Sequence, residues 1–519
     1  MACEAAAAVS GLRCSTIRYH LQGCAFLTAM LVGTALNAAV AQGDVDAPLV
    51  IRDVTIVDTR DGRLRPGMDV EIAGGKITRI ARADRSKTRA GASSIDGRNK
   101  FLVPGFNDMH VHPLQPDYDV RLVFPLMVAN GITGVRVMAS SPPQLSQRRA
   151  GTLPTGSVAP EILQMAGPPI LGATAPTPQA AVVEVAKQKQ MGAEFIKIID
   201  GGPVEYQPGA YMAVVDEAVR SGLPVGGHVP ATLDIRDVVA HRMTSVEHLG
   251  PDAGLIQACS TDEAALRAAF LKIPSTYRAL EPALFKTPSI ALPPVVLALF
   301  RRMIDTFDEK KCGELARTFA ASGTWQVPTL IRMQTNYVPT DPRFATDPNL
   351  RYVEAANVRQ WRMLLSRFER IPAADRATLA DLFRLELRVT RLFDANGAKM
   401  LAGSDFGGSW LTPGFSLHEE FDLLSRAGVA PLKVLQMTTL LPARYMRREA
   451  TMGTVKVGKD ANLVLLDANP IASVGALHRI RGVLRAGRYY PRAQLDAMLR
   501  DAERLAATNP ETPAAATAN

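Results

Sequence analysis

The 519-residue chain is poor in cysteine, tryptophan and charged residues. It has five Cys and three Trp, and only 21% of its residues are charged, so it lacks the charge excess of a disordered protein. Its 47% of hydrophobic residues can supply a large core. The net charge is +9, but no block of basic residues occurs, which argues against a nucleic-acid partner. We therefore expect a large globular protein.

Long apolar runs are scarce too, and the one candidate lies near the N-terminus. Arg13 and Arg18 precede an apolar run over residues 24–40, which ends in the small-residue site Ala39-Val40-Ala41. The pattern is typical of a cleavable signal peptide over residues 1–41. An uncleaved anchor is the alternative, although the run is short for a membrane span of about 20 residues. We expect a periplasmic or secreted protein without a stable membrane span after cleavage.

Cleavage would leave two of the five cysteines, Cys259 and Cys312. Two cysteines are too few for a disulfide framework in a chain of this size. They also lack the His/Cys spacing of a metal site. We interpret both as structural residues, and the sequence leaves undecided whether they form a disulfide bond.

Both ends of the chain contain short alternating segments with turn residues between them. Examples are Val54-Thr55-Ile56-Val57 near the start and Leu463-Val464-Leu465-Leu466 near the end. This texture predicts antiparallel strands. We expect residues 42–100 and 446–500 to form one small β-sandwich domain. Residues 501–519 end in an Ala/Thr/Pro-rich stretch and are predicted to be a flexible tail.

Residues 101–445 alternate short apolar strands with helical stretches, which is the rhythm of a parallel sheet or barrel. Eight strands can be counted, the number that closes a (β/α)8 TIM barrel, so the predicted fold class is α/β. Long helical insertions follow strands six and seven and should lie over the pocket. The predicted strands are Leu102–His112, Ile132–Met138, Glu161–Ala166, Glu194–Asp200, Leu223–Val229, Thr244–Leu249, Trp325–Ile331 and Lys399–Asp405.

Residues suited to metal binding fall at the ends of these strands. His110 and His112 are two apart, so both imidazoles can face the same side of a strand. His228, His248 and Asp405 lie at three other strand ends. Because strand ends meet at the mouth of such a barrel, we expect the five side chains to converge there.

Lys197 lies in an apolar strand, where an unpaired ammonium is costly to bury. A desolvated amine is more often neutral and can react with carbon dioxide. The product, a carbamate, is an anionic ligand able to bridge two cations. The alternative is a lysine that reaches solvent or a carboxylate. Asp108 faces the same side as His110 and is interpreted as polar barrel lining.

Three segments together resemble the amidohydrolase superfamily, in particular its branch of imidazolonepropionase-like proteins and Xaa-Pro dipeptidases. Residues 102–112 (LVPGFNDMHVH) resemble the first-strand motif of that family. Residues 195–198 (FIKI) resemble its carboxylated-lysine strand, and residues 453–467 (GTVKVGKDANLVLLD) resemble its closing β segment. The resemblance covers nearly all of the mature chain.

The resemblance implies a centre of two divalent metal ions. One ion would be bound by His110, His112 and Asp405, the other by His228 and His248, with carboxylated Lys197 as the bridge. Zinc is the first choice, although manganese, cobalt or iron would also suit these ligands. The expected reaction is cleavage of an amide bond by a hydroxide held between the two cations, with Asp405 as the catalytic acid and base.

The expected substrate is a small amide with a free carboxylate, such as an Xaa-Pro dipeptide or an N-acyl amino acid. Arg332 could hold that carboxylate by a two-point contact, or else pair with a structural acid. Tyr206 and Tyr211 could add hydroxyl donors, or else pack against helices. A lactonase or cyclic-amide hydrolase with the same centre is an alternative, and a non-catalytic exported binding protein is another. Assembly into a homo-oligomer stays open.

Overall fold

The computed structural model describes residues 48–84, 93–200, 206–249, 254–273 and 286–508. All of them belong to one structural unit, residues 44–519. The predicted signal peptide lies outside the described residues and stays a prediction. Among the described helices, none is long and apolar enough to cross a membrane.

Eight short parallel strands form the central barrel. Three are paired in the order β6-β7-β8 and five in the order β13-β12-β11-β10-β9. Parallel bridges from Ala166 to Phe195 and from Val111 to Phe406 join the two groups at both edges, so the ring closes and the (β/α)8 prediction is confirmed. The strands are β6 (Phe106–Val111), β7 (Ile132–Val137), β8 (Glu161–Met165), β9 (Ile196–Ile198), β10 (Val225–Gly227), β11 (Ser245–Glu247), β12 (Trp325–Val327) and β13 (Lys399–Met400).

One helix follows each of the first five barrel strands, and local sequence signals set the ends of these helices. Ser141 and Gln144 form a reciprocal capping box at the start of the second helix. Thr177 caps the third, which ends at Gly192 with a left-handed φ of 94°. The helices are α1 (Val120–Ala129), α2 (Pro142–Ala150), α3 (Pro178–Met191), α4 (Pro208–Arg220) and α5 (Ile235–Ala240).

The two predicted insertions are helical. The first, between β11 and β12, contains α6 (Leu255–Ala258), α7 (Glu263–Phe270), η4 (Pro288–Ala291), α8 (Pro294–Asp305) and α9 (Glu309–Ser322). The second, between β12 and β13, contains α10 (Leu330–Tyr337), α11 (Pro342–Ala345), η5 (Pro348–Tyr352), α12 (Ala355–Phe368) and α13 (Ala373–Ala395). The expectation of helical insertions is therefore confirmed.

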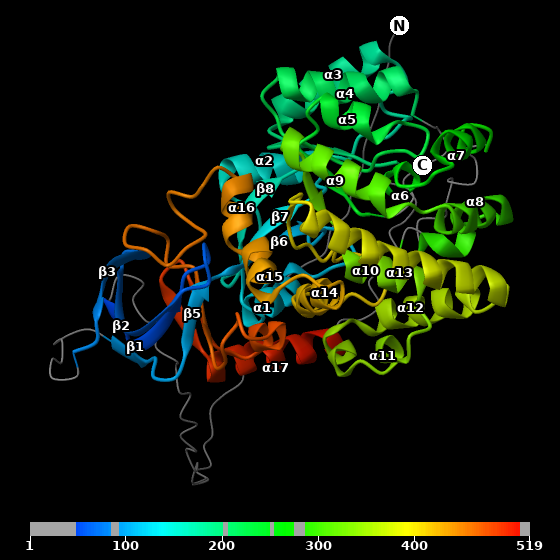
Figure 1. Ribbon diagram of the computed structural model, residues 1–519. Coiled ribbons are helices and arrows are strands. Elements are labelled where there is room, and N and C mark those ends of the chain that lie inside the picture. Colours follow the sequence, from blue (N-terminus) through cyan, green and yellow to red (C-terminus); the bar gives the residue numbers. More distant parts are fainter. Residues whose placement is uncertain (1–47, 85–92, 201–205, 250–253, 274–285, 509–519) are drawn as a thin grey trace, which may run out of the picture. The chain divides into compact units, whose positions relative to one another are not determined.

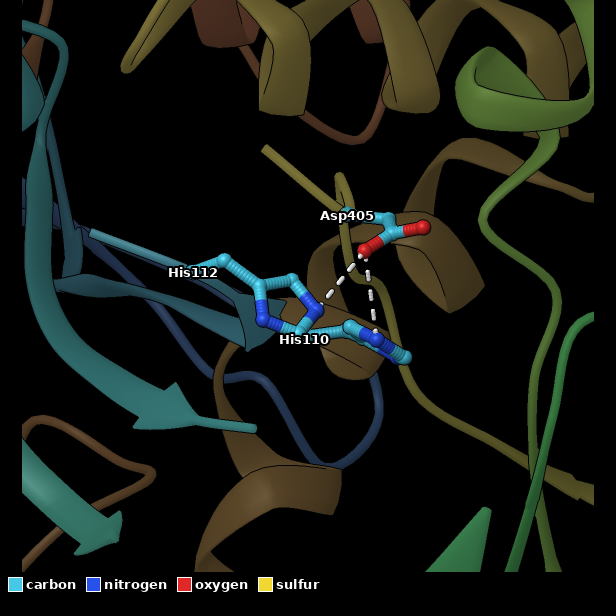
Figure 2. Close-up of side chains that lie close together, drawn as sticks. All are labelled: His110, His112 and Asp405. Atoms are coloured by element: carbon cyan, nitrogen blue, oxygen red, sulfur yellow. Dashed lines mark ion pairs between the residues drawn. The ribbon is translucent and has the colours of Figure 1, made fainter. Parts of the chain in front are cut away.

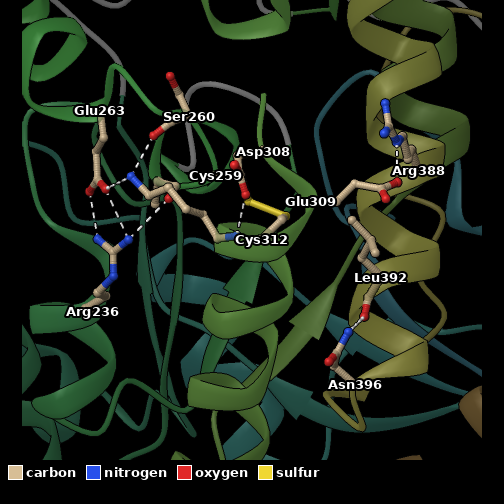
Figure 3. The surroundings of a disulfide bond; sticks show 12 residues. Arg236, Cys259, Ser260, Glu263, Asp308, Glu309, Cys312, Arg388, Leu392 and Asn396 are labelled. Carbon is tan, nitrogen blue, oxygen red and sulfur yellow. Dashed lines mark hydrogen bonds and ion pairs between the residues drawn. A yellow bond between two sulfur atoms is a disulfide. The ribbon is translucent and has the colours of Figure 1, made fainter. Parts of the chain in front are cut away.

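A disulfide bond joins Cys259, at the end of α6, to Cys312 on α9 (Figure 3). The Asp308 amide also donates to the Cys259 carbonyl at 2.9 Å. Lys311 strengthens the same connection, because its ammonium donates to the Ser260 carbonyl at 2.6 Å. The two cysteines whose pairing the sequence left undecided thus link the α6–α7 segment, which follows β11, to α9.

Strands from both chain ends form one eight-stranded sheet. The strands from the N-terminal part of the chain are blue in Figure 1. Its core contains Ile51, Val70, Leu463 and Leu484. The predicted strand Leu102–His112 is wrong in its extent, because the chain passes at Gly105 from this sheet into the barrel. The strands are β1 (Leu49–Val57), β2 (Leu64–Ala73), β3 (Lys76–Arg82), β4 (Ser93–Asp96), β5 (Phe101–Pro104), β14 (Leu463–Leu466), β15 (Ile480–Arg485) and β16 (Arg488–Pro491).

The C-terminal helix α17 (Arg492–Thr508) extends into the segment that was expected to be a tail. It stays ordered there because Ala502 and Ala506 are buried in the main hydrophobic core. Helix α17 packs against α1. The other elements after β13 are α14 (Phe415–Arg426), α15 (Pro431–Thr438), α16 (Leu440–Tyr445) and η6 (Val474–His478).

Candidate metal centre

His110 in β6, His112 directly after β6, and Asp405, five residues after the end of β13, point toward one another (Figure 2). The Oδ1 atom of Asp405 lies 3.3 Å from His110 Nε2 and 3.2 Å from His112 Nε2. The backbone fixes this arrangement, because the Asp405 amide donates to the His110 carbonyl at 2.8 Å. Two imidazoles and one carboxylate in this geometry can hold a divalent cation.

His228 and His248 extend the cluster from the ends of β10 and β11. The His248 ring lies 5.0 Å from the His110 ring and 4.9 Å from the His228 ring, measured between centroids. Its Nε2 atom is 3.9 Å from Asp405 Oδ2. The structure thus brings together all four histidines and the aspartate that the strand ends indicated.

Unusual backbone conformations position three of these ligand candidates. His248 and Asp405 have left-handed φ angles of 65° and 51°, which non-glycine residues seldom adopt outside constrained sites. Before His228, Gly227 has a φ of 150°, and a Cβ atom there would lie 1.9 Å from the Ile198 carbonyl oxygen. Only glycine therefore allows the close approach in which the His228 amide donates to that oxygen at 3.0 Å.

Lys197 lies in the middle of β9 with a side chain that is 1% exposed. Its Nζ atom has no hydrogen-bond partner among the described residues. Burial lowers the pKa of this amine to about 8. A buried, partly neutral amine without a partner is suited to reaction with carbon dioxide, which would give a carbamate able to bind metal.

The protonation states of the cluster also suit metal ligation. Burial lowers the pKa of His110 to about 4 and the pKa values of His228 and His248 well below their usual range, so these rings are neutral near pH 7. Burial opposes ionisation of Asp405, but the surrounding imidazoles hold its pKa well below the usual range. Neutral imidazoles and an ionised carboxylate are the forms that bind divalent cations.

A buried ion pair, which the sequence reasoning missed, lies behind His110. Glu247 on β11 accepts from His110 Nδ1 at 2.9 Å and from Arg136 Nη1 at 2.9 Å. The side chains of Arg136 and Glu247 are both 0% exposed. Burial opposes ionisation of Glu247, yet Arg136 and His110 hold its pKa well below the usual range. The sequence contains a sign of this pair, because Arg136 and Glu247 are charged residues in apolar strands, as Lys197 is.

Asp108 connects the two segments that carry His110 and Asp405. Its carboxylate accepts from the Ser404 amide at 2.9 Å, from the Ser404 hydroxyl at 2.6 Å and from the His110 amide at 3.2 Å. The side chain lines the barrel, as expected, and it also connects β6 to the segment that carries Asp405.

Arg332 lies beside the cluster, and its Nε atom is 3.3 Å from Asp405 Oδ2. Its Nη1 atom donates to the Lys286 carbonyl at 2.7 Å. The two tyrosines use their hydroxyls elsewhere. Tyr206 donates to the Ile170 carbonyl at 2.5 Å, and Tyr211 donates to the His228 carbonyl at 2.7 Å. Both tyrosine side chains are buried, and these bonds to backbone carbonyls position them. Their contact with substrate stays a prediction.

Known proteins that are similar to this chain include amidohydrolases. Residues 377–490 match the model of the Amidohydrolase family. An adenine deaminase from Rubrobacter xylanophilus is 29% identical over 210 residues, which is 37% of this chain and 33% of that protein. The chain thus spans about a third or less of the length of the curated relatives it matches.

Two solved structures share the fold over most of both chains. One is a Xaa-Pro dipeptidase with bound methionine in the active site, with a TM-score of 0.58, 18% identity and coverage of 86% of this chain and 100% of that chain. The other is a bottromycin amidohydrolase, with a TM-score of 0.62, 22% identity and coverage of 88% and 90%. At 18% and 22% identity these structures show the shared fold, and the match over residues 377–490 supports the resemblance to the Amidohydrolase family.

Proposed function

We propose that this amidohydrolase-like chain is a metal-dependent hydrolase that cleaves an amide bond in a small substrate with a free carboxylate. An Xaa-Pro dipeptide or an N-acyl amino acid fits this description. The observation that carries the proposal is the Lys197 amine, which has no hydrogen-bond partner among the described residues and is buried beside groups that could bind metal. It lies within electrostatic range of His110, His228 and His248.

In this proposal Lys197 is carboxylated. Its neutral amine forms a bond to the carbon of carbon dioxide and loses one proton, and the carbamate then offers two oxygen ligands. His110, His112 and Asp405 would hold one divalent cation, and His228 and His248 would hold the other. Zinc suits four imidazoles best, while manganese, cobalt and iron also accept this ligand set.

When bound, the cations would supply a water nucleophile near neutral pH and polarise the scissile carbonyl. Asp405 would take the proton from the attacking water and deliver it to the nitrogen of the leaving amine. Its carboxylate is well placed for this, because it is held between the imidazoles of His110 and His112 at 3.3 and 3.2 Å.

Arg332 is the proposed anchor for the substrate carboxylate. Its guanidinium already contacts the Asp405 carboxylate at 3.3 Å and lies at the proposed reaction centre. Arginine can bind a carboxylate through two parallel hydrogen bonds. We do not assign substrate contacts to Tyr206 or Tyr211, because their hydroxyls bond to the backbone.

Export remains part of the proposal. A disulfide bond between Cys259 and Cys312 agrees with an oxidising compartment, since such bonds persist outside the cytosol. The signal peptide pattern at residues 1–41 would direct the chain there.

The test combines metal analysis with a substrate panel on metal-loaded protein. We expect two divalent ions per chain and turnover of Xaa-Pro dipeptides or N-acyl amino acids. Faster turnover of lactones or cyclic amides would favour the alternative reaction, and protein without stoichiometric metal would favour a non-catalytic binding protein. Asp216→Asn is the control for replacement of Asp405. Asp216 also pairs with a histidine, His241, at 2.7 Å, but on exposed surface, so this variant should keep its metal content and turnover.

A further inference from the structure

Glu247 makes three hydrogen bonds inside the barrel. Its Oε2 atom accepts from His110 Nδ1 at 2.9 Å. Its Oε1 atom accepts from Arg136 Nη1 at 2.9 Å and from the Ser245 hydroxyl at 2.6 Å. Both carboxylate oxygens of this fully buried side chain therefore have partners.

Arg136 is held by aromatic rings as well as by Glu247. Its guanidinium lies 4.4 Å from the centre of the Phe195 ring and 5.0 Å from the centre of the Tyr445 ring. The pair packs closely against Gly226, where a side chain would collide with it. A Cβ atom at Gly226 would lie 2.4 Å from Ser245 Oγ, 2.9 Å from Arg136 Nη2 and 3.0 Å from Glu247 Oε1.

This contact determines that Nδ1 of His110 carries a proton. An ionised carboxylate only accepts hydrogen bonds, so His110 must present an N–H at Nδ1. In the neutral ring, Nε2 then keeps its lone pair. Nε2 is the atom that lies 3.3 Å from Asp405 Oδ1, on the side of the ligand cluster.

We propose that Glu247, held by Arg136, is a positioning residue that fixes the ring orientation and the tautomer of His110 for metal binding. Glu247 acts through His110 and has no contact with substrate in this role. The inference rests on the proposed function in one respect, namely that a cation binds at His110. Carboxylates that orient ligating histidines in this way typically change metal affinity about 10- to 100-fold.

Glu247→Gln is the sharpest variant because it keeps the size of the side chain. The amide oxygen of the glutamine should turn toward the cationic Arg136, where a charge-assisted bond is stronger. The amide NH2 group then faces His110 Nδ1 and requires it to accept. His110 would carry its proton on Nε2, and we expect affinity for Zn²⁺ to fall about 10- to 100-fold.

The double variant Arg136→Met/Glu247→Gln separates this role from a merely structural one. Without the arginine, the glutamine oxygen is free to accept from His110 Nδ1. We expect the double variant to bind Zn²⁺ more tightly than Glu247→Gln, although it removes more of the network. Glu386→Gln is the control, because Glu386 on α13 is equally buried and should keep wild-type affinity.

The tautomer can be read without a variant. In metal-free wild-type protein labelled with ¹⁵N-histidine, NMR should show a proton on His110 Nδ1, assigned by comparison with His110→Gln. An Nδ1 without a proton, or equal Zn²⁺ affinity in Glu247→Gln and wild type, would overturn the inference. Wild-type protein that binds no metal but has the proton on Nδ1 would instead overturn the proposed function.

Discussion

Replacing Lys197 by alanine should remove the anionic bridge between the two proposed cation sites. The amine is 1% exposed and has no hydrogen-bond partner among the described residues. Little else should change, because no hydrogen bond of the barrel depends on it. We expect Lys197→Ala to fold but to bind at most one divalent ion per chain, with turnover lost.

The pKa of Lys197 determines what fraction of its amine can react with carbon dioxide. Only the neutral amine reacts with carbon dioxide. With the pKa lowered from 10.5 to about 8, about one tenth of the amine is neutral at pH 7, against about three in ten thousand for an ordinary lysine. Burial thus increases the reactive form about 300-fold.

The sign of the pH dependence follows from deprotonation. The neutral fraction of an amine with a pKa of about 8 rises from about 1% at pH 6 to about half at pH 8. At constant dissolved carbon dioxide, metal-free protein should therefore acquire its second ion about 50-fold faster at pH 8 than at pH 6. Metal analysis after timed loading measures this rate.

Lys459→Ala is the matched control for Lys197→Ala. Lys459 is also largely buried, at 8% exposure, but its ammonium donates to the Met452 carbonyl at 2.9 Å. This variant should keep two ions per chain. Short carboxylic acids such as acetate should partly restore the second ion to Lys197→Ala. Two ions per chain and wild-type turnover in Lys197→Ala would refute the bridging role.

Three other variants test neighbouring groups. Asp405→Asn should lower kcat about 100- to 10,000-fold at equal metal content, because an amide cannot shuttle the proton; equal kcat in both proteins would contradict this. Arg332→Met should abolish the preference, in kcat/KM, for an N-acyl amino acid over its methyl ester. Arg136→Met should lower the free energy of unfolding by about 3–5 kcal/mol, because it leaves the Glu247 charge buried and unpaired. Urea unfolding measures this loss, which should be smaller when Glu247 is also replaced by Gln.

The barrel could be predicted because its strands alternate with helices along the chain. The first predicted strand shows the limit of that reasoning. Residues 102–112 form one apolar stretch, yet β5 pairs with β1 and β14 whereas β6 pairs with β7. The assignment of β5 depends on Leu463–Leu466, more than 350 residues away, and local periodicity contains no information about that partner.

The ligand candidates were accessible to the same reasoning, but their partners were not. Parallel strands end at one mouth, so His110, His228, His248 and Asp405 had to approach one another. Lys197 was noticed as a charge in an apolar strand, and the same criterion applies to Arg136 and Glu247. That these two bond to each other and to His110 depends on the closing of the ring. The hydroxyl directions of Tyr206 and Tyr211 depend on backbone acceptors and were likewise not visible.

Backbone conformation explains why strand periodicity missed Glu247. In an extended strand, consecutive side chains point to opposite faces, so Glu247 and His248 should not both face the ligand cluster. The left-handed φ of 65° at His248 interrupts the alternation. Glu247 therefore bonds His110, while His248 packs beside the same ring. Asp405, with a φ of 51°, does the same after Ser404, so that Ser404 bonds Asp108 while Asp405 contacts His110 and His112. Each left-handed residue lets two adjacent side chains serve one centre, and periodicity, which assumes extended backbone, can identify only one of each pair.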